Sequence, residues 1–195
     1  MSYLEALEPV IKRAIEPVAV ETDKTGRFPR VAINQLSKAG LLGLVSDRSV
    51  GGQGATLADA SAVVARIAQS CPSTAMVVVM HYCATAVIEK YGQETVRRDI
   101  AAGRHLTTLA FSEAGSRSHF WAPVGTAKLE GGKVRLDAVK SWVTSAGEAD
   151  SYVWSSKPLA ADGTSTIRRP AVRFPCATSS SSTGDSVPGS LWLST

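Results

Sequence analysis

Apolar residues in the first hundred positions recur at intervals of three and four, the spacing of an α-helix. The first such stripe covers residues 3–21, where Pro9 and Pro17 are expected to kink or end the helix and leave two short helices. A second helix is predicted from Phe28 to Gly40, because glycine is a typical C-terminal signal. Further helical patterns cover residues 58–69, 74–91 and 94–102. Residues 1–105 are therefore predicted to form an all-α bundle.

Segment 74–91 is apolar on almost every side, which predicts a helix at the centre of that bundle. His81 lies within it, and we interpret a single histidine on a buried helix as a satisfied core residue and not as a ligand or a base. The Gly-Gly-Gln-Gly sequence at 51–54 predicts a loop. It is not interpreted as a phosphate site, because no Lys-Ser or Lys-Thr pair follows it.

The helical pattern changes to alternation near Leu106. Residues 106–111 predict a strand, and residues 151–156 predict another. Between residues 126 and 137, apolar and polar residues alternate on both sides of Gly131-Gly132, which predicts a β-hairpin. Because a hairpin brings its two ends together, segments 112–118 and 142–144 are expected to lie close in space.

These two segments carry residue types that suit a nucleotide cofactor. Segment 109–118 follows a predicted strand and is rich in small and hydroxylated residues, whose N–H and hydroxyl groups can face an anion such as a pyrophosphate. Trp142 offers an aromatic face and Thr144 a hydroxyl, which suit a flat heterocycle with a polar edge. No G-x-G-x-x-G sequence joins a strand to a helix, so a Rossmann nicotinamide site is not predicted. The alternative is a Ser-rich loop and a core tryptophan in an ordinary β-domain.

The same segments resemble the acyl-CoA dehydrogenase family. The family's Thr-Glu-Pro-x-x-Gly-Ser-Asp type segment is matched by Ser112-Glu113-Ala114 and the residues 115–119 that follow. Its Trp-Ile-Thr segment, which comes after a hairpin, is matched by Trp142-Val143-Thr144. Lys140 stands at the lysine of the family's Asn-Gly-x-Lys-x-Trp pattern, and Ala149-Asp150 match the Ala-Asp that follows.

The resemblance implies a site for FAD. In the family, the first segment binds FAD along the isoalloxazine and the pyrophosphate, the tryptophan packs on the flavin ring, and the threonine hydroxyl reaches the N5 region. The implied cofactor contacts of this chain are Leu109, Ala110, Phe111, Ser112, Gly115, Ser116, Ser118, Trp142, Val143 and Thr144. Ser118 is also the implied contact with substrate. The chain departs from the family at Ala114, His119 and Asp137-Ala138, which concerns the expected substrate more than the expected flavin.

The reaction implied by the resemblance is α,β-dehydrogenation of an acyl-CoA thioester. The β-hydride passes to flavin N5, and a separate flavoprotein accepts the electrons. The family's catalytic base is a glutamate of a C-terminal helical domain that has no counterpart in this sequence. We therefore expect a truncated chain that is inactive alone, assign no catalytic base, and do not give that role to Glu113. The family also implies a homo-oligomer for a full-length protein.

Composition and charge argue against several other classes of protein. The net charge of +4 is scattered, and no dense basic run is interleaved with aromatics, so nucleic acid is not an expected partner. Cys71, Cys83 and Cys176 show no C-x-x-C spacing, which favours a reducing compartment over a disulfide framework or a zinc site. The N-terminus lacks a signal-peptide pattern, and the longest apolar run, 75–80, is too short to span a bilayer. We therefore expect a cytoplasmic protein.

The pattern of the chain changes again near residue 164. A hydroxyl-rich run at 178–183 and the Gly-, Ser- and Pro-rich sequence after it show neither helical nor strand periodicity. Residues 164–195 are expected to be a disordered or out-of-frame tail. The predicted fold class is α+β, with the all-α bundle followed at 106–163 by a partial antiparallel β-barrel or sheet.

Two other functions stay open at this point. The first is a flavin-dependent monooxygenase or oxidase on the same fold, which is suggested by His119 beside Phe120 and Trp121 at the expected substrate entrance. The oxygen reactivity of the reduced flavin would distinguish it from a dehydrogenase. The second is a non-enzymatic fragment without a cofactor site, whose exposed sheet edge binds a partner chain.

Overall fold

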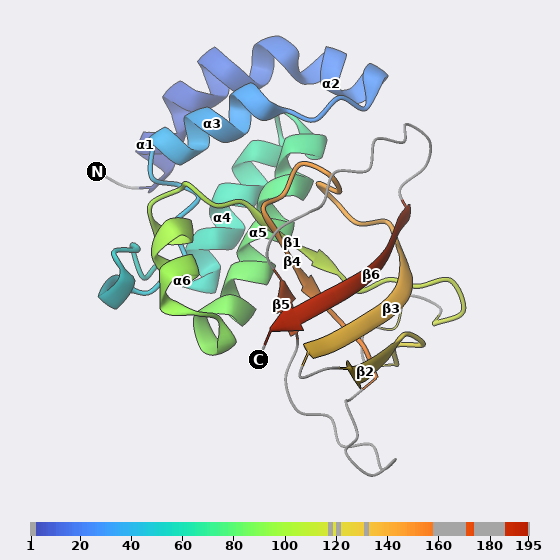
Figure 1. Cartoon of the computed structure of the whole chain (residues 1–195). Coiled ribbons are helices and arrows are strands. Elements are labelled where there is room, and N and C mark those ends of the chain that lie inside the picture. The colour runs from blue at the N-terminus through green and yellow to red at the C-terminus, as the bar shows by residue number, and fades with distance from the viewer. Residues whose placement is uncertain are drawn as a thin grey trace.

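The computed structural model of the chain describes residues 3–116, 119, 122–130, 133–157, 171–173 and 186–194. Helices precede strands along the chain, and Figure 1 shows the helices gathered on one side of the molecule and the strands on the other. The helices are α1 (Tyr3–Val10), α2 (Ala19–Thr25), α3 (Arg30–Lys38), α4 (Leu57–Ala68), α5 (Pro72–Tyr91) and α6 (Glu94–Ala101). The strands are β1 (Thr107–Ala110), β2 (Thr126–Glu130), β3 (Lys133–Ser141), β4 (Ser151–Trp154), β5 (Ala171–Arg173) and β6 (Ser186–Ser194). The predicted α+β class is confirmed.

The N-terminal prolines change the type of helix and do not open a loop. Pro9 lies inside α1, which continues into a π-helical turn (Ile11–Ile15) and a 3-10 turn (Glu16–Val18) before α2 begins. Pro17 has no N–H to give to a preceding carbonyl, so the helical pitch changes around it. The apolar stripe nevertheless stays on one face, because Leu7, Ile11 and Ile15 are all buried.

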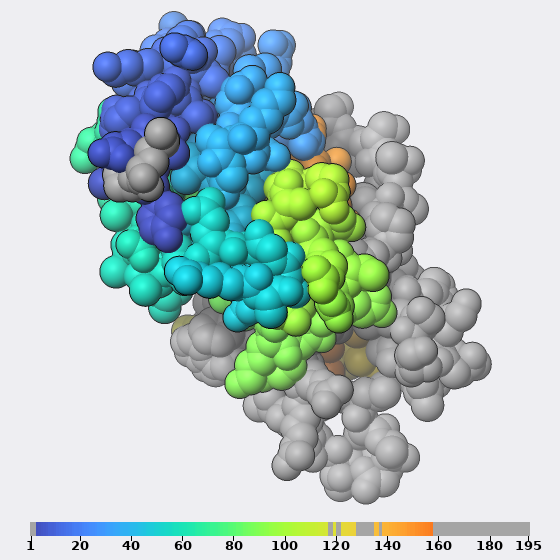
Figure 2. Space-filling view, turned by 90° about the vertical axis from the view of Figure 1, so that its left-hand side faces the viewer, coloured from blue at the N-terminus to red at the C-terminus, as the bar shows by residue number. Residues whose placement is uncertain are grey.

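The helices form a bundle, and α5 lies between the other helices and the strands (Figure 1). In Figure 2, the N-terminal helices (blue), α3 (light blue), the segment that follows it (cyan) and α6 (green) lie side by side on one face. α5 packs against α4, α6, β1 and β4, so it is the central helix, as the sequence predicts. It begins two residues before the predicted start, because Pro72 fits the first helical position and Cys71 Sγ accepts the Thr74 N–H at 3.4 Å. Among the described residues, no helix combines the length and apolarity that crossing a membrane requires.

His81 of α5 connects the helical bundle to the strand β1. The residue is fully buried; its Nδ1 accepts the Thr107 N–H at 3.2 Å, and its Nε2 lies 3.0 Å from the Leu42 carbonyl oxygen. Because Nδ1 accepts, these partners assign the neutral tautomer with the proton on Nε2. Burial lowers the pKa of His81 to about 4. The prediction of a satisfied core histidine is confirmed.

The strands form two three-stranded sheets in the described part of the chain, with orders β1-β4-β5 and β2-β3-β6. The β2–β3 hairpin has the predicted register, from Thr126 opposite Asp137 to Glu130 opposite Lys133. One pairing differs from the expected antiparallel arrangement, because β1 and β4 are parallel. The hairpin connects them, and a connection of that length lets the chain return in the same direction. No closed barrel forms among the described strands.

Two short parts of the region expected to be a tail are strands. β5 pairs with β4, and β6 pairs with β3 along nine residues. The sequence pattern predicted neither strand, and the rest of residues 164–195 lies outside the described residues. A disordered or out-of-frame origin of this segment stays a prediction.

Candidate functional site

The ends of β1 and β3 lie beside each other, as the hairpin predicted. The Ser141 N–H donates to the Ser112 carbonyl at 2.9 Å, and Glu113 and Lys140 form an isolated antiparallel bridge. Farther along, the Thr108 hydroxyl donates to the Thr144 carbonyl at 2.7 Å. The two segments that the sequence singled out are therefore joined by backbone and side-chain hydrogen bonds.

A buried ion pair connects these two segments. The side chains of Lys140 and Glu113 are 0% and 4% exposed, and the ammonium contacts the Glu113 carboxylate. The ammonium also donates to the Ser155 carbonyl at 2.6 Å and to the Ser155 hydroxyl at 3.0 Å, and lies 3.4 Å from the Phe111 carbonyl oxygen. It stands 5.0 Å from the centre of the Trp154 ring, a favourable cation–π distance. Each partner thus has the hydrogen bonds that a buried charge requires.

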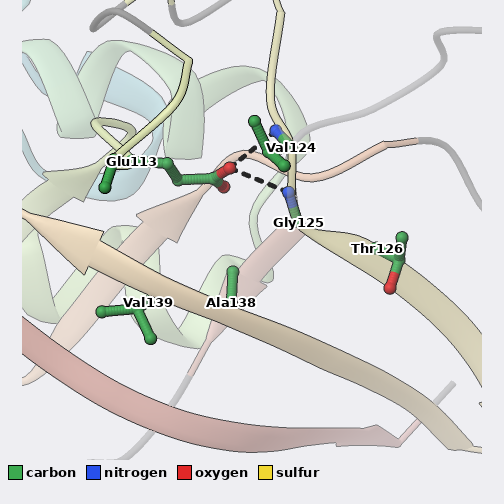
Figure 3. A pocket seen from close by; sticks show the side chains of 7 residues that line it. Glu113, Val124, Gly125, Thr126, Ala138 and Val139 are labelled. Atoms are coloured by element: carbon green, nitrogen blue, oxygen red, sulfur yellow. Dashed lines mark hydrogen bonds between the residues drawn. The ribbon is translucent and has the colours of Figure 1, made fainter.

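The second carboxylate oxygen of Glu113 holds the segment that leads into β2. It accepts the N–H groups of Val124 and Gly125 at 2.6 and 2.8 Å (Figure 3). Burial alone would raise the pKa of Glu113, but the bonds from Lys140, Gly125 and Val124 outweigh it, so its pKa lies below the usual value. A carboxylate that is ionised and fully engaged is unsuited to act as a general base.

Glu113 also lines a surface cavity of about 300 Å³. Figure 3 shows Ala138 and Val139 of β3 on one side of the cavity and Val124 and Gly125 on the other. Apart from Glu113 and Thr126, the side chains that line it carry no polar group, and the Glu113 oxygens are occupied. None of the predicted cofactor contacts lines this cavity.

Trp142 is exposed and strained. Its side chain is 77% exposed, and its φ is +56°, a left-handed conformation that costs a bulky residue about 1–2 kcal/mol. Ser145, three residues on, also has a positive φ of 64°. Residues with backbone strain of this kind cluster at active sites and at segments that clamp ligands.

The loop after Trp142 is fixed from several sides. The Val143 side chain is buried in the main hydrophobic cluster, whereas Thr144 is half-buried. The Gly147 N–H donates to the Tyr152 hydroxyl at 2.8 Å, and Arg30 of α3 pairs with the Glu148 carboxylate. Trp142 is therefore the exposed end of an otherwise anchored loop.

The described residues of segment 109–118 differ in burial and in the groups that they could offer to a ligand. Leu109 and Phe111 are half-buried and pack on a cluster formed by α5, α6 and β4, and Ala110 is buried in the main core, so these residues offer mainly backbone groups. Gly115 has a φ of +94°, which glycine alone adopts without strain. Ser116 is buried, and its hydroxyl donates to the Glu113 carbonyl at 3.0 Å. The predicted contact Ser118 lies outside the described residues.

The part of the site expected to receive the flavin ring fits a planar group. The exposed indole of Trp142 supplies a stacking surface beside the half-buried Thr144. The backbone of residues 109–112 runs next to it through the Ser112–Ser141 hydrogen bond. On the phosphate side, the N–H and the hydroxyl of Ser116 both donate to the Glu113 carbonyl within their own turn, so a phosphate oxygen would have to displace these bonds to use either donor. No group of His, Cys, Asp and Glu that could hold a metal ion occurs among the described residues.

Sequence reasoning missed the pairing of Glu113 with Lys140. From the sequence, Lys140 was identified only as a match to a family pattern, and Glu113 only as a position in the expected cofactor loop. A signal was present in the strand alternation, because Leu136 and Ala138 face the core and Lys140 continues on the same side.

Solved structures share this arrangement of a helical bundle followed by a small sheet. A structure of KijD3 in complex with FMN and dTDP-3-amino-2,3,6-trideoxy-4-keto-3-methyl-D-glucose has a TM-score of 0.73 and 23% identity, covering 88% of this chain and 43% of that one. The acyl-CoA dehydrogenase from Geobacillus kaustophilus has a TM-score of 0.69 and 22% identity, covering 78% of this chain and 41% of that one. These likenesses define the fold class.

Sequence comparison gives the family. The family model "Acyl-CoA dehydrogenase, N-terminal domain" matches residues 2–103, more than half of the 195 residues, and the chain belongs to the acyl-CoA dehydrogenase family. The human short-chain specific acyl-CoA dehydrogenase of mitochondria is 26% identical over 155 residues. That match covers 77% of this chain and 38% of the relative, so the chain spans well under half of its relative's length.

Proposed function

We propose that the chain binds FAD where the ends of β1 and β3 meet, and that it serves the α,β-dehydrogenation of an acyl-CoA thioester. The observation that supports this best is Trp142, an indole held in solvent in a left-handed conformation beside the loop that follows β1. The family membership and the flavin in a structural neighbour point the same way.

Some of the proposed residues would contact the flavin ring of FAD, and others would contact its pyrophosphate. Trp142 would stack on the flavin ring, the Thr144 hydroxyl would reach its polar edge, and Val143 would contribute backbone only, because its side chain is buried. Leu109, Ala110, Phe111 and Ser112 would present backbone groups, and Gly115 and Ser116 would form the turn near the pyrophosphate. Bound FAD would supply the hydride acceptor of the reaction. Ser118 is the proposed substrate contact.

Within the described residues, no carboxylate is assigned as the base that removes the α-proton. The ion pair with Lys140 and the bond from the Val124 N–H argue against Glu113 in that role. The proposed partners are the acyl-CoA substrate, an electron-accepting flavoprotein and further copies of the chain, and the proposed location is the cytoplasm.

A titration of the purified chain with FAD, followed by flavin fluorescence, tests the cofactor site. We expect quenching that saturates in the unmodified chain and is lost in Trp142→Ala, because the stacking surface is removed. Tyr91→Ala is the matched control, since Tyr91 is another exposed aromatic residue, 47% exposed on α5, and lies outside the proposed site. Absence of quenching by the unmodified chain, or equal quenching by Trp142→Ala, would refute the proposal.

A flavin-dependent monooxygenase or oxidase is the second candidate. The KijD3 structure with FMN and a dTDP-sugar favours it, because that neighbour with the same fold holds a nucleotide sugar and not a thioester. The two candidates predict different fates for the reduced flavin. Rapid reoxidation of the photoreduced, protein-bound flavin by dissolved oxygen would favour the monooxygenase or oxidase, and slow reoxidation would favour the dehydrogenase.

A further inference from the structure

Lys140 occupies a position where strand alternation calls for an apolar side chain. Leu136 and Ala138 precede it on the inward face of β3, whereas Val139 points to solvent and is 55% exposed. Fully buried lysines are rare, and replacing a buried ion pair by well-packed apolar residues is often neutral or stabilising. The stability of the fold alone therefore does not account for a charge at this position.

The Lys140 ammonium instead joins segments that come from three elements. It contacts the Phe111 carbonyl after β1, the Glu113 carboxylate in the following turn, and both oxygens of Ser155 after β4. Three N–H donors on one nitrogen suit such a junction. Trp142 follows the end of β3, two residues after Lys140.

Glu113 extends the junction to a fourth segment. Its second oxygen holds the Val124 and Gly125 N–H groups, so one carboxylate fixes the turn at 113–116 against both β3 and the entry to β2. The Ser116 N–H and hydroxyl both donate to the Glu113 carbonyl, at 3.2 and 3.0 Å. The turn on the proposed phosphate side and the strand that leads to the stacking indole thus share this one ion pair.

We propose that the Glu113–Lys140 pair positions the two halves of the flavin site relative to each other, an inference that rests on the proposed function. Neither residue is catalytic, because their polar groups face protein partners. The pair sets the spacing between segment 109–116 and residues 142–144. A site held this way loses affinity when the supporting bonds are removed, even if its contact residues are unchanged.

The test uses the double variant Glu113→Gln/Lys140→Met. Glutamine keeps an oxygen for the Val124 and Gly125 N–H groups, methionine fills the lysine's space, and no unpaired charge stays buried, so the chain is expected to fold. Arg66→Met is the matched control, because it removes a partly buried ion pair between α4 and Glu8 of α1 that contacts neither the junction nor the loop of Trp142.

Two measurements separate positioning from mere stability. The first needs no flavin: it is the ¹⁹F signal of 5-fluorotryptophan at Trp142, assigned with Trp142→Phe, in variants whose far-ultraviolet circular dichroism is unchanged. In the double variant we expect this signal to shift or broaden, and the Kd for FAD to rise by about tenfold or more, the size of coupling within one network. Arg66→Met should change neither.

A folded double variant with an unaltered Trp142 signal or an unaltered Kd for FAD would overturn the proposal. If the unmodified chain binds no FAD, the proposed function fails, and the Trp142 signal alone decides whether the pair positions this segment. If the double variant does not fold, Ser155→Ala takes its place. This variant removes the hydroxyl bonded to the ammonium without stranding a charge, and we expect a smaller change of the Trp142 signal; an unchanged signal would contradict the proposal.

Discussion

Acid should destabilise the chain well above the pH at which carboxylates titrate, because of His81. Its neutral ring accepts the Thr107 N–H, so a proton on Nδ1 would place two donors against each other in a fully buried site. The pKa falls from 6.5 to about 4 on folding. The unfolded chain therefore binds the proton first, and stability is complete above pH 6.5 and is lost as the pH falls from there towards 4.

The magnitude follows from the two pKa values. The whole shift corresponds to about 3 kcal/mol, of which about 2 kcal/mol is lost between pH 8 and pH 5. Urea unfolding followed by circular dichroism over this range measures it. The variant His81→Asn keeps an oxygen near the Thr107 N–H but does not titrate, so its stability should fall by about 2 kcal/mol less than that of the unmodified chain.

The control for this measurement is His105→Asn. His105 is half-buried, and burial lowers its pKa as well, so it contributes to the slope in the same direction. The variant should reduce the pH dependence while leaving the part due to His81. A stability difference between the unmodified chain and His81→Asn that stays constant from pH 8 to pH 5 would refute the reasoning.

Two further predictions concern backbone conformation and packing. Trp142→Gly should be more stable to urea than Trp142→Ala by about 1 kcal/mol, because φ is +56° and glycine alone adopts it freely; equal stabilities would contradict the strain. Gly43→Ala should destabilise the chain by about 1–3 kcal/mol or more in thermal unfolding, because the added Cβ would lie 2.1 Å from the Ala101 carbonyl oxygen. Gly26→Ala is the comparison, since its added Cβ meets no atom and only the positive φ opposes the change, at a cost of about 1–2 kcal/mol; an unchanged stability of Gly43→Ala would contradict the close contact with Ala101.

Regular elements were predictable wherever the pattern was local. Residues 126–137 alternate around two glycines, and the hairpin has that register. The close approach of segments 112–118 and 142–144 then followed from the geometry of a hairpin, and Ser112 and Ser141 are bonded as a result. The strand β6 shows the converse, because its Gly- and Pro-containing sequence has no clear alternation and its pairing with β3 was not predicted.

What the sequence by itself determined is therefore the order of the helices and of the strands as far as β4, the hairpin, and the family motifs at its two ends, all of which depend on residues close in the chain. Only the tertiary structure decided which carboxylate meets Lys140, which groups satisfy His81, and that Trp142 stands exposed in a left-handed conformation. The physical reason is that a buried charge or imidazole is stabilised by its partners. Those partners lie 27 and 26 residues away along the chain, so no local periodicity identifies them.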